Sequence, residues 1–76
     1  MAQRILIIDD DPAQLRILEE SIKRFGFAPL TANGGEKGLE ILSSSTGATI
    51  ELIILDLVMP GMDGMEFLEH LSAHRT

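Results

Sequence analysis

Two short apolar runs that each end in aspartate constrain the fold of this chain more than any other feature. Residues 5–8 read Ile-Leu-Ile-Ile and are followed by three consecutive aspartates at 9–11, whereas residues 52–55 read Leu-Ile-Ile-Leu and are followed by Asp56. A run that is apolar on both alternating faces is typical of a strand buried between two helical layers. The sequence therefore predicts two buried strands that each end in carboxylates.

The residues after the first run carry the start and stop signals of a helix. Asp11 occupies an N-cap position and Pro12 the favoured first helical position. The following apolar residues recur at helical spacing: Leu15, Leu18, Ile22 and Phe25. Gly26 stands where a glycine commonly ends a helix. These signals predict a helix that begins after Asp11 and ends before Gly26.

A second strand and a second helix are predicted next. Residues 27–31 favour a strand, and Pro29 places it at a sheet edge because proline donates no ladder hydrogen bond. Turn residues at 33–35 lead into a short helix over 36–42, which Gly38 weakens. The Ser, Thr and Gly residues at 43–47 predict a polar, mobile loop.

A third helix is predicted beyond Asp56, with Asp63 as its cap and an apolar series at Met65, Phe67, Leu68 and Leu71. Strands and helices thus alternate three times, which predicts an α/β fold with parallel strands, right-handed crossovers and helices on both faces of the sheet. The first strand lies centrally in this arrangement, and the expected strand order is 2-1-3. We treat residues 1–76 as a single domain.

The carboxyl ends of the first and third strands are the expected site. In doubly wound sheets, ligands bind beyond the strand ends at the point where the strand order reverses, and that point lies between these two strands. Asp9, Asp10 and Asp56 all fall there. Hard cations such as Mg²⁺ take oxygen ligands at about 2.0–2.1 Å. Because like charges clustered without a cation destabilise a fold, the three acids predict a Mg²⁺ site, whereas Asp11 is interpreted as a helix cap.

Composition narrows the classes of partner. Twelve acidic residues against six Lys and Arg give a formal net charge of −6, which argues against direct nucleic-acid contact, because such contact requires cations that neutralise phosphates. The apolar run at 5–8 is too short for a signal peptide or a membrane span. The chain holds no cysteine, as is compatible with a reducing compartment. We expect a cytoplasmic protein without membrane contact.

These residues resemble a known family, the receiver domains of two-component response regulators, often called CheY-like. The resemblance is carried by Ile-Ile-Asp-Asp-Asp-Pro at 7–12, by Asp-Leu-Val-Met-Pro-Gly-Met-Asp-Gly at 56–64, and by the spacing between them. The turns Phe25-Gly26-Phe27 and Asn33-Gly34 also match. The similarity extends over essentially the whole chain and implies a flavodoxin-like doubly wound sheet.

The resemblance implies a signalling module rather than an enzyme. Asp56 would be the phosphoacceptor, taking a phosphoryl group from a sensor histidine kinase or a phosphotransfer protein. Asp10 would coordinate Mg²⁺ directly, Asp9 directly or through water, and the backbone carbonyl of Val58 would be a further ligand. A cation is expected beside the nucleophile because phosphoryl transfer depends on positioning and charge neutralisation.

The chain departs from the family pattern at its end. A complete receiver would continue through two further strand and helix units that bring a Ser or Thr, a Lys and a switch aromatic, yet only twenty residues follow Asp56. We therefore expect a partial receiver over 1–76, truncated to three β/α units, with slow or unstable phosphorylation. The third strand would keep an unpaired edge that invites self-association.

Two alternatives stay open. The chain could be an association module that completes its sheet with another chain and performs no phosphotransfer. A third hypothesis is a Mg²⁺-dependent phosphatase of the haloacid dehalogenase type, which needs an acid two residues after its nucleophile, where this chain has Val58. His70 and His74 lie four residues apart on the third predicted helix and are interpreted as solvated side chains without a role.

Overall fold

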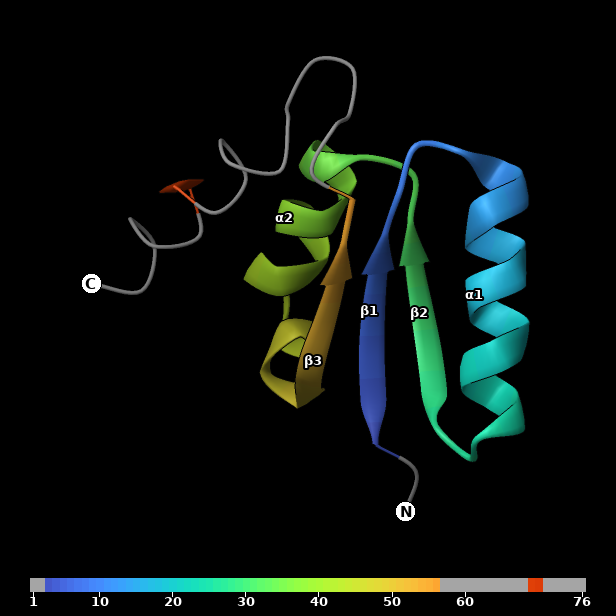
Figure 1. Ribbon diagram of the computed structural model, residues 1–76. Helices are drawn as coiled ribbons and strands as arrows, with labels where there is room; N and C mark the ends of the chain where they lie inside the picture. The colour runs from blue at the N-terminus through green and yellow to red at the C-terminus, as the bar shows by residue number, and fades with distance from the viewer. Residues whose placement is uncertain (1–2, 57–68, 71–76) are drawn as a thin grey trace.

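The computed structural model describes residues 3–56 and 69–70 of the chain. Its elements are β1 (Arg4–Ile8), α1 (Pro12–Arg24), β2 (Ala28–Ala32), α2 (Gly35–Ser43), the 3-10 helix η1 (Ser45–Thr49) and β3 (Ile50–Leu55). The strands form a parallel sheet in the order β2-β1-β3 (Figure 1). The predicted α/β class and strand order are therefore confirmed.

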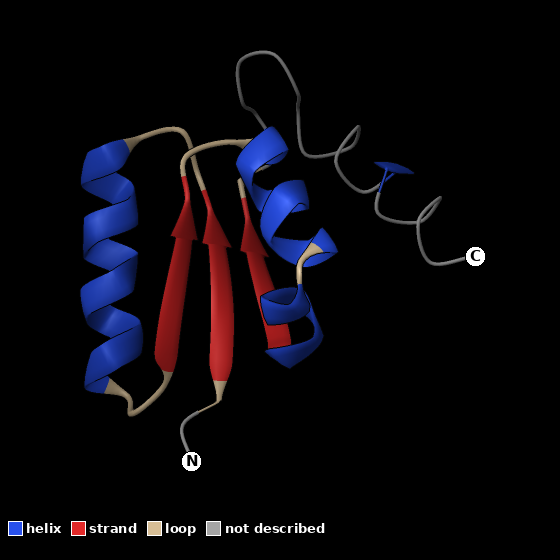
Figure 2. Ribbon diagram, turned by 180° about the vertical axis from the view of Figure 1, so that it is seen from behind, coloured by secondary structure: helices blue, strands red, loops and turns tan. Residues whose placement is uncertain are grey.

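The two helices lie on either side of the sheet. Helical connections between parallel strands form right-handed crossovers. The connection from β1 to β2 through α1 and the connection from β2 to β3 through α2 run in opposite directions across the sheet, because β1 lies in the centre. They must therefore lie on opposite faces. Figure 1 shows α1 and α2 flanking the strands, and the view from behind in Figure 2 shows the same arrangement.

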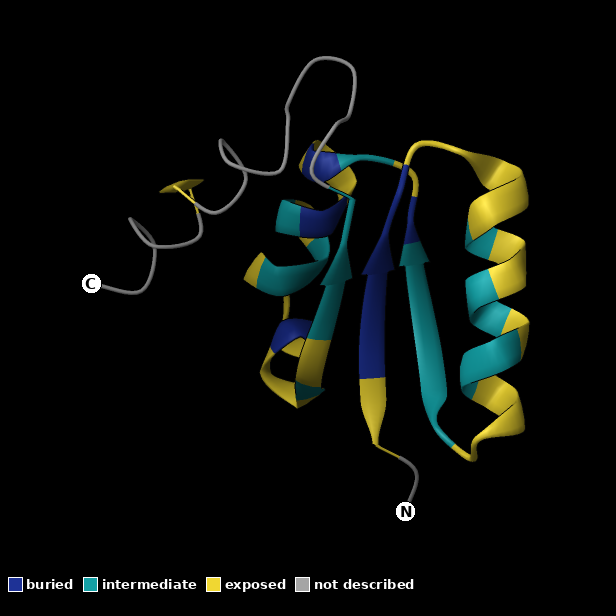
Figure 3. Cartoon of the chain, viewed as in Figure 1, coloured by how far each residue is buried: buried dark blue, intermediate teal, exposed yellow. Residues whose placement is uncertain are grey.

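The core is built around β1. Leu6 and Ile7 are fully buried and Ile8 is 1% exposed, so this strand is covered on both faces (Figure 3). Leu6, Ile8 and Ala32 form one buried cluster, and half-buried apolar residues of three other elements pack against it: Leu30, Leu39, Ile41, Leu42, Ile50, Ile53 and Leu55. Full burial of a leucine or isoleucine side chain, as at Leu6 and Ile8, contributes about 1.5–3 kcal/mol, before the entropy cost of ordering the chain.

Both predicted ends of α1 are confirmed. The Ala13 N–H donates to the Asp11 side chain over 3.0 Å, which is an N-cap bond. At the other end Gly26 adopts a φ of 89°, and its N–H donates to the Lys23 carbonyl over 2.9 Å. The left-handed conformation at Gly26 closes the helix in a Schellman motif. Phe25, which the sequence pattern placed in the apolar stripe, is instead 77% exposed, because it is the C-cap residue and turns away from the sheet.

The predicted polar loop at 43–47 is wrong. α2 extends to Ser43, and η1 begins two residues later at Ser45. Serine and threonine hydroxyls usually favour loops, but in this segment they bond to nearby backbone carbonyls. The Thr49 Oγ1 donates to the Thr46 carbonyl over 2.6 Å. Gly47 is buried against the backbone of Leu42, where a Cβ atom would lie 2.1 Å from the carbonyl oxygen. The segment is compact helical structure.

β3 pairs with β1 through a register irregularity. Arg4 lies opposite Ile50 but Ile5 lies opposite Leu52, so Glu51 is an extra residue in the ladder. β2 occupies one edge of the sheet, as Pro29 predicted. The predicted third helix falls largely outside the described residues, within which only Glu69 and His70 belong to it and are helical. None of the helices in the described part of the chain is long and apolar enough to cross a membrane.

Candidate functional site

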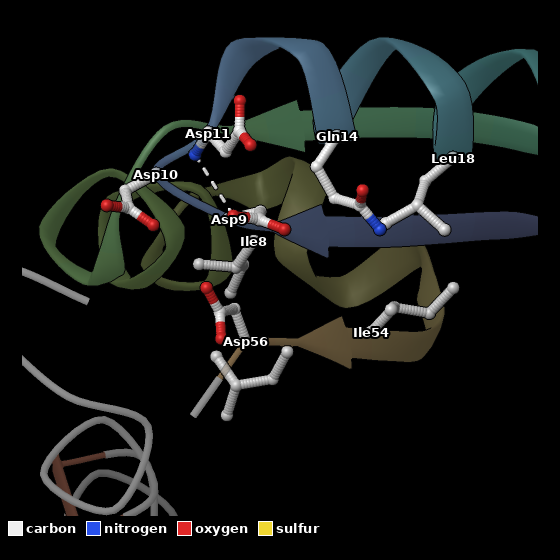
Figure 4. A pocket seen from close by; sticks show the side chains of 9 residues that line it. Ile8, Asp9, Asp10, Asp11, Gln14, Leu18, Ile54 and Asp56 are labelled. Atoms are coloured by element: carbon white, nitrogen blue, oxygen red, sulfur yellow. Dashed lines mark hydrogen bonds between the residues drawn. The ribbon is translucent and has the colours of Figure 1, made fainter. Parts of the chain in front are cut away.

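Three aspartates meet at the carboxyl edge of the sheet. Asp9 and Asp10 follow β1, Asp56 follows β3, and each offers one carboxylate oxygen such that the three oxygens lie within 4.8 Å of one another (Figure 4). Asp9 is buried at 8% exposure, Asp56 is half-buried and Asp10 is exposed. The structure thus brings together the three acids that the sequence placed at this edge.

The strand register explains why these acids meet. After the extra residue Glu51, the two apolar runs pair one to one, and Ile8 lies opposite Leu55. Asp9 and Asp56 each stand one residue beyond that pair. The Asp56 N–H donates to the Ile8 carbonyl over 3.0 Å, and the Asp9 N–H donates to the Ala32 carbonyl over 3.1 Å. Main-chain hydrogen bonds that continue the sheet therefore hold both positions.

Asp11 has a different place from the other acids. Its own N–H donates to Asp9 Oδ1 over 3.0 Å, while its side chain caps α1 through Ala13. It is exposed and does not belong to the three-aspartate cluster. Its interpretation as a helix cap is confirmed.

The cluster lines a pocket of about 610 Å³. The pocket walls come from the ends of β1 and β3 and from the first two turns of α1: Ile8, Asp9, Asp10, Asp11, Gln14, Leu18, Ile54, Leu55 and Asp56. The sequence had not singled out Gln14, whose side chain extends from α1 toward β1 (Figure 4). Its position three residues after the cap, on the helix that starts at the acidic edge, is the signal that would have identified it.

The donor set fits a hard divalent cation. All three clustered side chains are carboxylates, Mg²⁺ prefers oxygen ligands, and three like charges this close repel one another unless a cation neutralises them. The residues present therefore suit Mg²⁺. Val58, whose carbonyl the sequence assigned as a further ligand, lies outside the described residues, as does His74. His70 is exposed and does not belong to the acidic cluster.

The sequence matches a known family. The family profile described as response regulator receiver domain matches residues 5–76. One similar relative is the transcriptional regulatory protein YrkP of Bacillus subtilis, which is 39% identical over 71 residues, a stretch that covers 93% of this chain and 29% of YrkP. The chain therefore spans less than a third of that relative.

Solved structures share the fold. The N-terminal domain of a response regulator receiver protein from Methanoculleus marisnigri superposes with a TM-score of 0.83 at 36% identity, covering 91% of this chain and 54% of that one. Response regulator TrrA of Thermotoga maritima, solved in complex with Mg²⁺-BeF, superposes with a TM-score of 0.83 at 33% identity. That match covers 99% of this chain and 62% of TrrA. The prediction that 1–76 form a partial receiver stays a prediction.

Proposed function

Because the chain belongs to the response regulator receiver domain family of two-component systems, we propose that it accepts a phosphoryl group on Asp56 with Mg²⁺ held beside that residue. Receiver domains are generally signal-transduction modules that interact with histidine kinases or phosphotransfer proteins. The observation that carries the proposal is the cluster of Asp9, Asp10 and Asp56 within 4.8 Å at the reversal point of the sheet. Family membership favours this function over a haloacid-dehalogenase-type phosphatase.

Asp56 is the proposed nucleophile because of its position at the end of β3. It is half-buried at the end of β3, its backbone is bonded to Ile8, and its side chain lines the pocket. In the transfer, a carboxylate oxygen of Asp56 bonds to phosphorus as the bond from phosphorus to the donor's imidazole nitrogen breaks. The electron pair of the broken bond stays with the imidazole, and Asp56 becomes an acyl phosphate.

Asp9 and Asp10 are the proposed metal ligands, together with Asp56 and the backbone carbonyl of Val58. When bound, Mg²⁺ supplies positive charge that offsets the repulsion between a carboxylate and a phosphoryl group. Asp9 is buried directly after β1, whereas Asp10 is exposed. The Mg²⁺-BeF complex of TrrA supports the choice of cation.

Intact mass spectrometry after incubation with Mg²⁺ and acetyl phosphate tests the proposal. We expect one phosphoryl adduct on the native chain, with loss of the adduct in EDTA and in the isosteric variant Asp56→Asn. Glu51→Gln is the matched control, because it removes one carboxylate from the same strand at an exposed position away from the pocket. An adduct that persists in Asp56→Asn, or no adduct on a chain shown to be folded by circular dichroism, contradicts the proposal.

A second candidate function is association through β3. Within the described residues β3 pairs with β1 alone, and Leu52 on this strand is 56% exposed. An uncovered apolar edge of this kind favours pairing with another chain. We infer that a chain limited to residues 1–76 self-associates through this edge, and the two candidate functions are compatible because the edge and the acidic cluster involve different side chains.

A further inference from the structure

We propose that Asp11 is a positioning residue for the cation site: its side-chain cap on α1 fixes its own backbone N–H, and that N–H orients the carboxylate of Asp9. The inference rests on the proposed Mg²⁺ site. Asp11 itself lies outside the three-aspartate cluster, so its role acts through Asp9.

Two hydrogen bonds meet at Asp11. Its N–H donates to Asp9 Oδ1 over 3.0 Å, and its Oδ1 accepts from the Ala13 N–H over 3.0 Å. The first bond belongs to the site and the second to the helix. Because both bonds involve the same residue, the backbone orientation that satisfies the cap is also the one that directs the N–H at Asp9. The cap at the start of α1 and the orientation of the Asp9 carboxylate are therefore coupled.

Asp9 is the acid of the cluster that the bond from Asp11 restrains. The terminal torsion of an aspartate side chain is broad, so a carboxylate without a fixed partner samples a wide range of orientations. Asp9 is buried, whereas Asp10 is exposed. The bond from Asp11 engages one oxygen of Asp9 and thereby restricts this rotation. Partners that orient metal ligands typically contribute 10–100-fold to metal affinity.

Two neutral variants separate the cap from the charge of Asp11. Asp11→Asn and Asp11→Ala both remove a negative charge near the site, but only asparagine retains a capping oxygen. Isothermal titration with Mg²⁺ therefore compares them without a difference in net charge. We expect Asp11→Ala to bind Mg²⁺ about tenfold more weakly than Asp11→Asn. Equal dissociation constants in the two variants overturn the inference.

Gly26→Ala is the matched control for a loss of helix stability. Gly26 ends the same helix at a φ of 89°, a conformation that alanine adopts only with strain, and it lies at the opposite end of α1 from the acids. The control should lower the melting temperature as Asp11→Ala does, yet bind Mg²⁺ like the native chain. If Gly26→Ala weakens Mg²⁺ binding as much as Asp11→Ala, general helix destabilisation explains the effect and the inference fails.

Hydrogen exchange of the position-11 amide gives a readout without any metal. In the metal-free chain we expect this amide to exchange several-fold faster in Asp11→Ala than in Asp11→Asn, because loss of the cap releases its bond to Asp9. Equal exchange rates overturn the coupling. A native chain that binds no Mg²⁺ contradicts the proposed function and the metal-positioning role together, whereas Mg²⁺ binding that is equal in the two variants contradicts the positioning role alone.

Discussion

β1 and β3 have nearly the same apolar sequence but very different surroundings. The run Ile-Leu-Ile-Ile at 5–8 is buried throughout, at no more than 4% exposure per residue. The run Leu-Ile-Ile-Leu at 52–55 begins with a residue that is 56% exposed and continues with three that are half-buried. β1 lies in the centre of the sheet with a strand on each side, whereas β3 is paired on one side within the described residues. Position in the sheet, rather than composition, sets burial.

Both strands nevertheless contribute to the cluster, β1 with Asp9 and Asp10 and β3 with Asp56. Asp9 and Asp56 stand one residue beyond paired positions, and each backbone N–H is bonded to a neighbouring strand. The site is therefore built across a well-buried strand and a poorly buried one. This difference predicts that the cost of a substitution depends on which strand carries it, even when the residue type is the same.

The largest expected effect compares leucine truncation on the two strands. Leu6→Ala removes a fully buried side chain and should destabilise the fold by about 2–5 kcal/mol. Leu52→Ala removes a side chain that is 56% exposed and should cost less than about 1 kcal/mol. Urea unfolding followed by circular dichroism measures both, since the chain has no Trp or Tyr. Equal losses of unfolding free energy in the two variants would contradict the difference between β1 and β3.

The next effect concerns how β3 is joined to α2. Gly47→Ala would place a Cβ atom 2.1 Å from the Leu42 carbonyl oxygen, so the backbone must shift, at a cost of about 1–3 kcal/mol. Gly34→Ala is the matched control, because a Cβ there has no atom within 4 Å and the backbone at Gly34 is extended. The same unfolding measurement distinguishes them. A stable Gly47→Ala variant would show that η1 does not restrain the start of β3.

A smaller effect tests the acids at the two strand ends. Without divalent cation, Asp56→Asn relieves repulsion from Asp9 and Asp10 and should stabilise the fold by about 1 kcal/mol. With Mg²⁺ at ten times its dissociation constant, the native chain should gain about 1.4 kcal/mol, and the variant should gain less. Thermal unfolding with and without Mg²⁺ checks both signs. A melting temperature of the native chain that does not change on addition of Mg²⁺ would contradict the proposed site.

The smallest effect on stability is expected at the edge of β3. Leu52→Lys introduces a charge at an exposed position, which should change the free energy of unfolding by less than about 0.5 kcal/mol. It should nevertheless abolish self-association, because an edge lysine opposes strand pairing. Sedimentation velocity over a range of concentrations detects this, with Ile17→Lys on α1, an equally exposed apolar position, as control. Association that survives Leu52→Lys would remove β3 as the interface.

Much of this architecture could be predicted because local signals agreed with tertiary position. Asp11, Pro12 and Gly26 bounded α1, and the two runs ending in aspartate predicted neighbouring strands whose acids meet at one edge. These signals depend only on the residues of the segment itself. Asp11 supplies a side-chain oxygen that caps the helix, the ring of Pro12 fixes φ, and Gly26 has no side chain. They act in the same way wherever the segment lies in the fold.

The failures arose where tertiary contacts override composition. The serines and threonines of 43–47 favour a loop, yet their hydroxyls bond to carbonyls and Gly47 packs against α2. Phe25 continues the helical period, but the Schellman turn directs it outward. The extra residue Glu51 sets the pairing of β3 and had no local signal. Gln14 lines the pocket because α1 starts at the acidic edge, and only its position three residues after the cap could have identified it.

Main-chain hydrogen bonds hold the backbone of Asp9 and Asp56 in place, whereas the side chains of these residues supply the carboxylates of the site. Amide and carbonyl groups make those bonds, and every residue except proline has the N–H that they need. Side chains at the two positions can therefore be exchanged while the strands keep their alignment. Histidine or cysteine at either position would present softer donors from the same backbone positions and shift the preference toward zinc or copper. This sheet edge is a ready scaffold for redesigned metal selectivity.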